Sequence, residues 1–132
     1  MKIISILIFF FSLINLHAEE PKKNPNHKFT MDPTAVFEDG PPARFRVIVP
    51  IQAIANMEYT LELHVEGDGK GENLKLVAKE APRANNMGTI VGIINMKTSD
   101  LPEAKSEYHY KLVLKDNNGI VVNWTDVHRI KK

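Results

Sequence analysis

The chain contains no cysteine among its 132 residues, and this absence excludes several kinds of chemistry at once. Without a thiol there is no disulfide framework, no cysteine nucleophile, no thiolate metal site and no thiol redox reaction. Exported proteins without disulfides are more typical of a bacterial periplasm or surface than of an animal secretory pathway. The fold must instead be stabilised by buried apolar side chains, for which a chain of this length is sufficient.

The sequence also lacks an excess of charge of either sign. Lysine and arginine together number 17, against 16 aspartate and glutamate residues. Removal of an amino-terminal segment that includes Lys2, as argued next, leaves 17 − 1 = 16 basic residues facing 16 acidic ones. Proteins that bind nucleic acid in general present a basic face. The charge balance therefore predicts no nucleic-acid partner.

Only one long apolar run is present, and it lies at the amino terminus. Lys2 precedes a run from Ile3 to Ile14 that is nearly free of polar residues, and Ala18 follows it. This order is typical of a signal peptide, and the run is shorter than the roughly 20 residues that a transmembrane helix needs. We predict that residues 1–18 are a signal peptide, that the protein is exported to the periplasm or the cell surface, and that no transmembrane segment remains after cleavage. An uncleaved amino-terminal anchor is the alternative, because Leu16 is bulkier than the residue usual at that position.

The rest of the chain predicts a flexible leader, residues 19–28, and one domain, residues 29–132. The leader is charged and rich in proline and has no large apolar residue, so burial cannot offset the entropy of ordering it. In the domain, apolar and polar residues alternate with a period of two, which is typical of half-buried strands. We expect strands at 29–37, 44–52, 59–66, 74–79, 89–96, 108–115 and after Gly119.

Seven strands separated by turn signals, with no long helical period, predict an all-β fold built as an antiparallel two-sheet sandwich. Over residues 29–130 this pattern resembles the immunoglobulin-like and fibronectin-III-like sandwiches of exported proteins. The resemblance concerns architecture alone. The paired cysteines of true immunoglobulin domains are missing, and Trp124 stands in the last strand, where we expect it to anchor the core. Residues 89–96 are apolar on both faces, which predicts a central or covered strand.

A diffuse apolar band is the first candidate for a functional surface. Several β-branched residues fall on the outward faces of their strands, and neighbouring strands would bring them together as a surface for a protein partner or for self-association. The alternative is that β-branched residues simply favour strands. The members of the band are Ile48, Val77, Val91, Ile93, Val113 and Val121, of which Ile48, Val91, Ile93 and Val113 are the predicted partner-binding residues.

A metal site is the second candidate. His64, His109 and His128, with Glu62 or Glu66, would suit zinc or copper if their strands were adjacent. Three methionines would add thioether ligands for a copper carrier, although core packing explains Met96 more simply. The alternative function is therefore a small periplasmic metal-binding protein, and without that site no cofactor is expected. The three methionines are Met57, Met87 and Met96.

No motif predicts an enzyme. Asp126 and His128 would share a strand face, but no nucleophile elbow accompanies them. The glycine-rich segment 67–72 has neither the Ser or Thr that a phosphate-binding loop needs after its lysine nor the acidic ligands of a calcium loop, so it predicts a mobile hairpin tip. Asn123 fits the glycosylation pattern but lies in a predicted strand beside Trp124. The sequence predicts a non-enzymatic module that works by protein contact.

Overall fold

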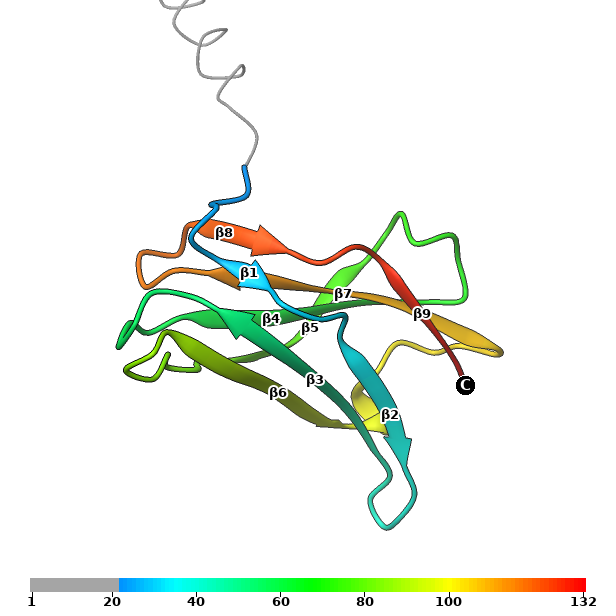
Figure 1. Ribbon diagram of the computed structural model, residues 1–132. Coiled ribbons are helices and arrows are strands. Elements are labelled where there is room, and N and C mark those ends of the chain that lie inside the picture. The colour runs from blue at the N-terminus through cyan, green and yellow to red at the C-terminus, as the bar shows by residue number, and fades with distance from the viewer. Residues whose placement is uncertain (1–21) are drawn as a thin grey trace, which may run out of the picture.

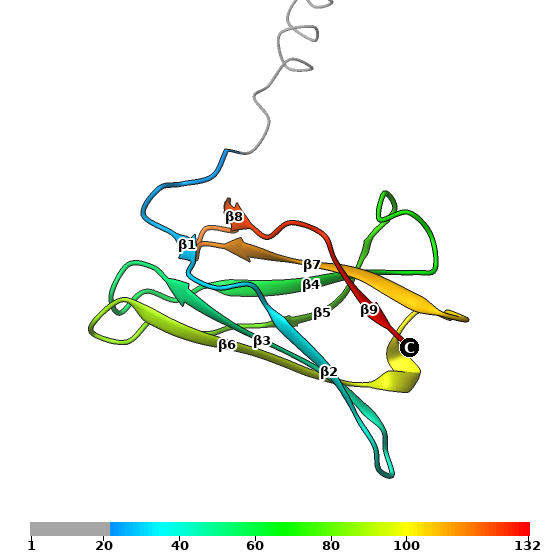
Figure 2. The ribbon, with the colours of Figure 1, turned by 45° about the vertical axis from the view of Figure 1, so that its right-hand side comes forward.

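The computed structural model describes residues 22–132, which fold into two antiparallel β-sheets packed face to face (Figures 1 and 2). The predicted signal peptide, residues 1–18, lies outside the described residues. In the first sheet, β3 is central, β6 pairs with one side of it, and β1 and β2 follow one another along the other side. These strands are β1 (Lys28–Phe29), β2 (Thr34–Glu38), β3 (Arg44–Gln52) and β6 (Thr89–Lys97).

The second sheet has the order β5, β4, β7, with β8 and β9 following one another along the free side of β7. A single turn of 3₁₀-helix, η1 (Thr98–Asp100), connects the two sheets after β6. The strands are β4 (Thr60–Gly67), β5 (Lys75–Glu80), β7 (Glu107–Lys115), β8 (Val121–Trp124) and β9 (His128–Lys131). The predicted immunoglobulin-like two-sheet sandwich is confirmed, with nine strands within residues 22–132 in place of about seven.

Proline explains why one edge strand of the first sheet is broken into β1 and β2. Pro33 separates them, as the sequence predicts for that segment. The carbonyl of Pro50 in β3 accepts the amide of Thr30 at 3.1 Å, so the side of Pro50 that lacks an N–H faces the gap between β1 and β2. The N–H that proline lacks is therefore not needed, because no strand pairs with β3 at this gap.

The core lies between the two sheets and is made of the inward side chains of β3, β4, β6 and β7. Aromatic rings fill one end of it, with Phe45 lying 5.1 Å from Phe37 and 6.2 Å from Tyr110, measured between ring centroids. Aliphatic residues fill the middle. The aliphatic side chains with 1% exposure or less are Val47, Val49, Ile51, Leu61, Leu63, Val65, Ile94, Leu112 and Leu114.

The strand β6 does not take the central position that its apolar sequence predicts. Among the described residues it pairs with β3 alone, which makes it an edge strand. Ile90, Ile94 and Met96 point into the core as expected, while Val91 and Ile93 point outward. Apolar residues on both faces are common to a covered strand and to an edge strand with an exposed apolar face, so the pattern alone cannot separate them.

Two β-bulges reverse the faces that strict alternation predicts. In β5 the register shifts opposite Leu63 and His64, so Leu76 lies outside next to His64 while Val77 packs against the core. In the β7–β8 pair the register shifts between Leu114 and Lys115. This second shift leaves Val122 and Asn123 buried and Trp124 only half-buried on the outside. The predictions that Val77 is outward and that Trp124 anchors the core are therefore wrong.

The last part of the predicted flexible leader packs against the domain. The amide of Asn24 donates to the carbonyl of Val122 at 2.7 Å, and the side-chain amide of Asn123 donates to the carbonyl of His27. His27 is 3% exposed. Because the Asn123 amide group is buried and already bonded, it offers no acceptor site for a glycan.

Hydrogen bonds attach the base of the glycine-rich loop after β4 to the rest of the domain. The Asp68 carboxylate accepts the amides of Lys105 at 2.7 Å and Ser106 at 3.0 Å. A Cβ atom on Gly67 would lie 2.3 Å from the carbonyl oxygen of Glu103, so only glycine allows this approach. The loop is thereby attached to the connection between β6 and β7.

No helix in the part of the chain from 22 to 132 has the length and apolar character needed to cross a membrane.

Candidate interaction surfaces

The outer face of the first sheet carries a contiguous apolar patch. Ile48 lies opposite Ile93 and Pro50 lies opposite Val91 in the β3–β6 ladder, with all four side chains pointing away from the core. Directly opposite residues in such a pair have Cβ atoms about 4.5–5.5 Å apart, so the four side chains are in contact range. We call these four residues, Ile48, Pro50, Val91 and Ile93, the outer patch.

The two β6 members of the outer patch are the most exposed. Val91 is 62% exposed and Ile93 is 47% exposed, whereas Ile48 is half-buried. Polar and basic groups border the patch along the strands. At one end Arg46 forms an ion pair with Glu38, and Arg44 donates to the side-chain oxygen of Asn95 at 3.5 Å. The patch thus has an apolar centre and a polar rim, as protein interfaces have.

The structure divides the predicted apolar band between two opposite faces of the molecule. Ile48, Val91 and Ile93 come together in the outer patch. Val113 lies in β7 of the other sheet, where it is 8% exposed, and Val121 lies nearby in β8. Val113 therefore does not extend the outer patch as the sequence predicts.

A second surface covers the outside of the other sheet. It is an open depression of about 610 Å³, in which the indole of Trp124 and the side chains of Val113 and Val121 meet polar groups of β4 and β7. Trp124 lies directly opposite Val113 in the ladder. We call it the Trp124 depression, lined by Glu62, His64, Lys111, Val113, Lys115, Val121 and Trp124.

Glu62 is the electrostatic centre of the Trp124 depression. One carboxylate oxygen lies 3.0 Å from the Nε2 atom of His64 and the other lies 3.0 Å from the Lys115 ammonium nitrogen. Burial acts to raise the pKa of this carboxyl group, but hydrogen bonds from His64 and Lys115 hold the pKa below its ordinary value. Glu62 is therefore ionised at neutral pH with its charge already paired.

The predicted histidine site is not assembled. Glu66 lies opposite His109 and Lys111 lies opposite His64, so these two histidines are diagonal neighbours on the outer side of the second sheet. His128 lies opposite Tyr110, whose ring belongs to the core, and thus falls on the other face. Among residues 22–132 no group of three or more His, Asp or Glu side chains could hold a metal ion.

His109 is buried beneath the glycine-rich loop. A Cβ atom on Gly71 would lie 3.2 Å from the imidazole of His109 and 3.1 Å from the Val127 side chain, which shows how closely the loop covers this ring. The Nδ1 atom of His109 has no hydrogen-bond partner among the described residues. The methionines are also dispersed, since Met96 packs in the core and Met87 is exposed in a loop.

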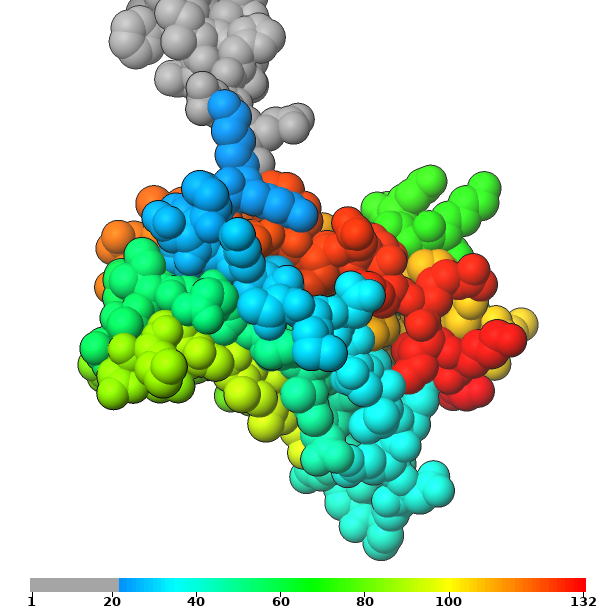
Figure 3. Space-filling model, in the orientation of Figure 1, coloured from blue at the N-terminus to red at the C-terminus, as the bar shows by residue number. Residues whose placement is uncertain are grey.

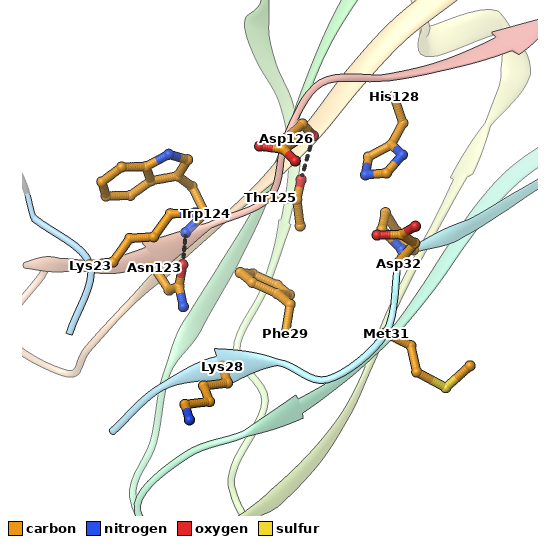
Figure 4. Close-up of a pocket in the computed structure, with 11 residues that line it drawn as sticks. Lys23, Lys28, Phe29, Met31, Asp32, Asn123, Trp124, Thr125, Asp126 and His128 are labelled. Atoms are coloured by element: carbon orange, nitrogen blue, oxygen red, sulfur yellow. Dashed lines mark hydrogen bonds between the residues drawn. The ribbon is translucent and has the colours of Figure 1, made fainter. Parts of the chain in front are cut away.

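A smaller depression of about 280 Å³ lies beside β1, between the amino-terminal segment and the β8–β9 connection (Figure 4). Asp126 and His128, the pair noted in the sequence, both line it together with Asp32. Trp124 stands at its border, and the Lys23 ammonium group lies 5.2 Å from the centroid of the indole. Among the described residues that line this depression, Thr125 alone carries an aliphatic hydroxyl, and it donates to the Asp126 carbonyl and accepts the Leu112 amide.

No family model matches the chain, and no curated protein matches it. Solved structures that resemble it are much larger proteins. They include a Bacteroides fragilis protein assigned as a β-galactosidase (TM-score 0.47, 15% identity, covering 81% of this chain and 16% of that one) and β-glucosidase 3B from Thermotoga neapolitana (TM-score 0.45, 14% identity, 81% and 16%). A β-glucosidase from Listeria innocua has a TM-score of 0.44 and 8% identity, covering 76% and 16%. The chain spans about one sixth of each of these proteins, and matches at this level carry no information on activity or substrate.

Sequence reasoning missed two contributors to these surfaces. Pro50 faces outward and belongs to the outer patch, but it is not among the residues predicted for the apolar band. Trp124 was assigned to the core, and only the bulge in the β7–β8 pair places it on the outside. The position of Pro50 could have been recognised from the outward placement of its neighbours two residues away.

Proposed function

We propose that the protein is an exported, non-enzymatic β-sandwich that acts by binding a protein through the outer patch. The observation that carries this proposal is the pairing of Ile48 with Ile93 and of Pro50 with Val91, which gathers four apolar side chains on a face that the rest of the described chain leaves uncovered. Singly exposed apolar residues need no explanation, but a contiguous group with a polar rim is typical of an interaction site. Export rests on the signal-like segment 1–18 alone.

The test is a double substitution within the patch. Val91→Lys with Ile93→Glu places opposite charges on a face that contributes nothing to the core, so the domain remains folded by circular dichroism. Capture of envelope proteins by the tagged chain is expected to be lost. A matched control carries Leu76→Lys with Ile120→Glu, because these two apolar residues are about equally exposed and lie elsewhere.

Unchanged capture of envelope proteins by the folded patch variant would contradict the proposal. The Trp124 depression would then be the candidate binding surface. The proposal would also be contradicted if the control variant lost capture while the patch variant kept it. Unfolding of the patch variant would contradict the outward assignment of Val91 and Ile93.

A further inference from the structure

The free edge of β6 differs from the free edge of β5 in the other sheet. In β5 the edge carries a bulge and three charged residues, Lys75, Lys79 and Glu80, all devices that prevent a foreign strand from pairing. In β6 no bulge interrupts the nine-residue strand and residues 90–96 carry no charge. Figure 3 shows the yellow-green β6 region at the lower left of the molecule.

The main-chain groups that β6 presents at its free edge can be assigned. The Gly88 carbonyl accepts from Ala53 and the Thr98 amide donates to Ala43, so even-numbered residues of this segment direct their N–H and C=O groups toward β3. Odd-numbered residues direct theirs to the opposite side. Thr89 is the first of these, and its two groups are occupied by Asn85, at 2.9 Å to the side-chain oxygen and 3.1 Å to the amide.

The open part of the edge therefore begins at Val91 and continues through Ile93, Asn95 and Lys97. No hydrogen bond from their main-chain groups toward the free side is present in the described part of the chain. These four residues are centred on Ile94. When two antiparallel strands pair, two opposite residues whose main-chain N–H and C=O groups point toward each other form two reciprocal hydrogen bonds.

From this symmetry we infer that two copies of the chain pair along β6, antiparallel, about a two-fold axis at Ile94. Val91 of one copy then lies opposite Lys97 of the other, and Ile93 lies opposite Asn95. All open edge groups of both copies are satisfied, and two four-stranded sheets become one continuous sheet. The inference rests on the proposed protein-binding function and names a second copy as the partner.

Charge and apolar contacts favour the same arrangement. Lys97 and Arg44 lie opposite each other at one end of the β3–β6 ladder, and Thr89 and Gln52 lie at the other. The two-fold axis brings the basic end of each copy beside the uncharged end of its partner, so like charges are kept apart. It also places the two outer patches side by side as one self-complementary surface, which a two-fold interface requires.

Single cysteine variants of the full chain test the axis directly, because the native sequence contains no cysteine. In Ile93→Cys the two introduced residues are diagonal neighbours, about 7–8 Å apart. In Val91→Cys they are offset by six residues, about 20 Å along the strand. A short bifunctional thiol reagent is expected to link Ile93→Cys into covalent dimers and to leave Val91→Cys monomeric, although Val91 is the more exposed of the two.

Ile93→Pro tests the edge separately from the apolar face. The lost N–H points away from β3, so the ladder within the monomer is kept while the intermolecular bonds that Ile93 donates are removed, and analytical ultracentrifugation should show a monomer. Ile48→Lys changes the face without touching β6 and should leave the dimer intact. Should Ile93→Pro fail to fold, the cysteine pair decides the matter.

A wild-type chain that sediments as a monomer would overturn the inference, as would dimeric Ile93→Pro or linking of Val91→Cys in place of Ile93→Cys. If the patch variant described above loses its envelope partner while the cysteine variants do not link, the outer patch binds a different protein. The inference then fails and the proposed function stands.

Discussion

The Nε2 atom of the His27 imidazole lies 2.9 Å from the hydroxyl oxygen of Tyr59, inside the domain. That hydroxyl also accepts the amide hydrogen of Ile54 at 3.0 Å, which leaves its own proton to donate to Nε2. His27 thus joins the amino-terminal segment to the loop before β4. Its Nδ1 atom has no hydrogen-bond partner among the described residues.

The first prediction is that stability falls in mildly acid solution because of His27. Burial lowers the pKa of His27 below its ordinary value of 6.5, against a smaller opposing effect of Asp116. The unfolded chain therefore takes up a proton before the folded one does, so the contribution of His27 is complete above pH 6.5 and is lost as the pH falls through the folded pKa. We expect the melting temperature to drop between pH 7.5 and pH 5, and to drop less in His27→Gln. Equal slopes in the two proteins would show that His27 is not responsible.

The second prediction concerns the anchoring of the glycine-rich loop by Asp68. Amide hydrogen bonds from Lys105 and Ser106 hold the pKa of Asp68 well below its ordinary value of 3.8. Its stabilising effect is thus complete above pH 3.8 and disappears as the pH falls through the folded pKa. At pH 7, Asp68→Asn should lower the melting temperature. The exposed carboxylate of Asp39 provides the control, and Asp39→Asn should change the melting temperature little. Equal melting temperatures for the two variants would count against the anchor.

Period-two alternation predicted the faces of β3 and β6 correctly, because both strands pair without interruption along their length. It failed at Leu76, Val77 and Trp124, because a bulge adds one residue to β5 and to β8 and so reverses the alternation from one side of the bulge to the other. A bulge is set by the partner strand and by the packing around it. A single strand's sequence therefore does not reveal it.

For the candidate surfaces, the sequence predicts which residues point outward, but it does not predict which of them lie together. Ile48, Val91 and Ile93 share a face because their strands are neighbours, a relationship that follows from sheet order and not from the residues themselves. The same dependence separates His128 from His64 and His109. Burial of His27 in the predicted leader could not be foreseen either, because its partners Tyr59 and Asn123 are 32 and 96 residues away in the sequence.

The third prediction is that Gly92→Ala destabilises the domain although it lies in a regular strand. Gly92 points into the core, where an added Cβ atom would lie 2.6 Å from the Leu61 side chain and 3.2 Å from that of Val49. Both neighbours are buried, so one of them must leave its position. We expect a loss of about 1–3 kcal/mol in the free energy of unfolding, measured by urea denaturation. Partial recovery in the double variant with Leu61→Val would identify the contact, and an unchanged midpoint would refute it.

The fourth prediction is that Trp124→Ala costs less than removal of a core aromatic residue. Trp124 is half-buried and packs on the outer side of the sheet across from Val113. Loss of about two thirds of a roughly 200 Å² apolar surface, at about 25 cal/mol per Å², corresponds to about 3 kcal/mol. Phe45→Ala, at a site with 0% exposure, should cost about 3–5 kcal/mol.

Both values come from urea denaturation of the folded chain. Trp124 is the only tryptophan, so the intrinsic fluorescence of the wild-type protein reports on this surface. Because the indole lies on the outside, a soluble quencher such as acrylamide should reach it in the folded state, whereas a core position would protect it. A cost for Trp124→Ala equal to that for Phe45→Ala, together with protection from the quencher, would restore Trp124 to the core and remove the Trp124 depression as a surface.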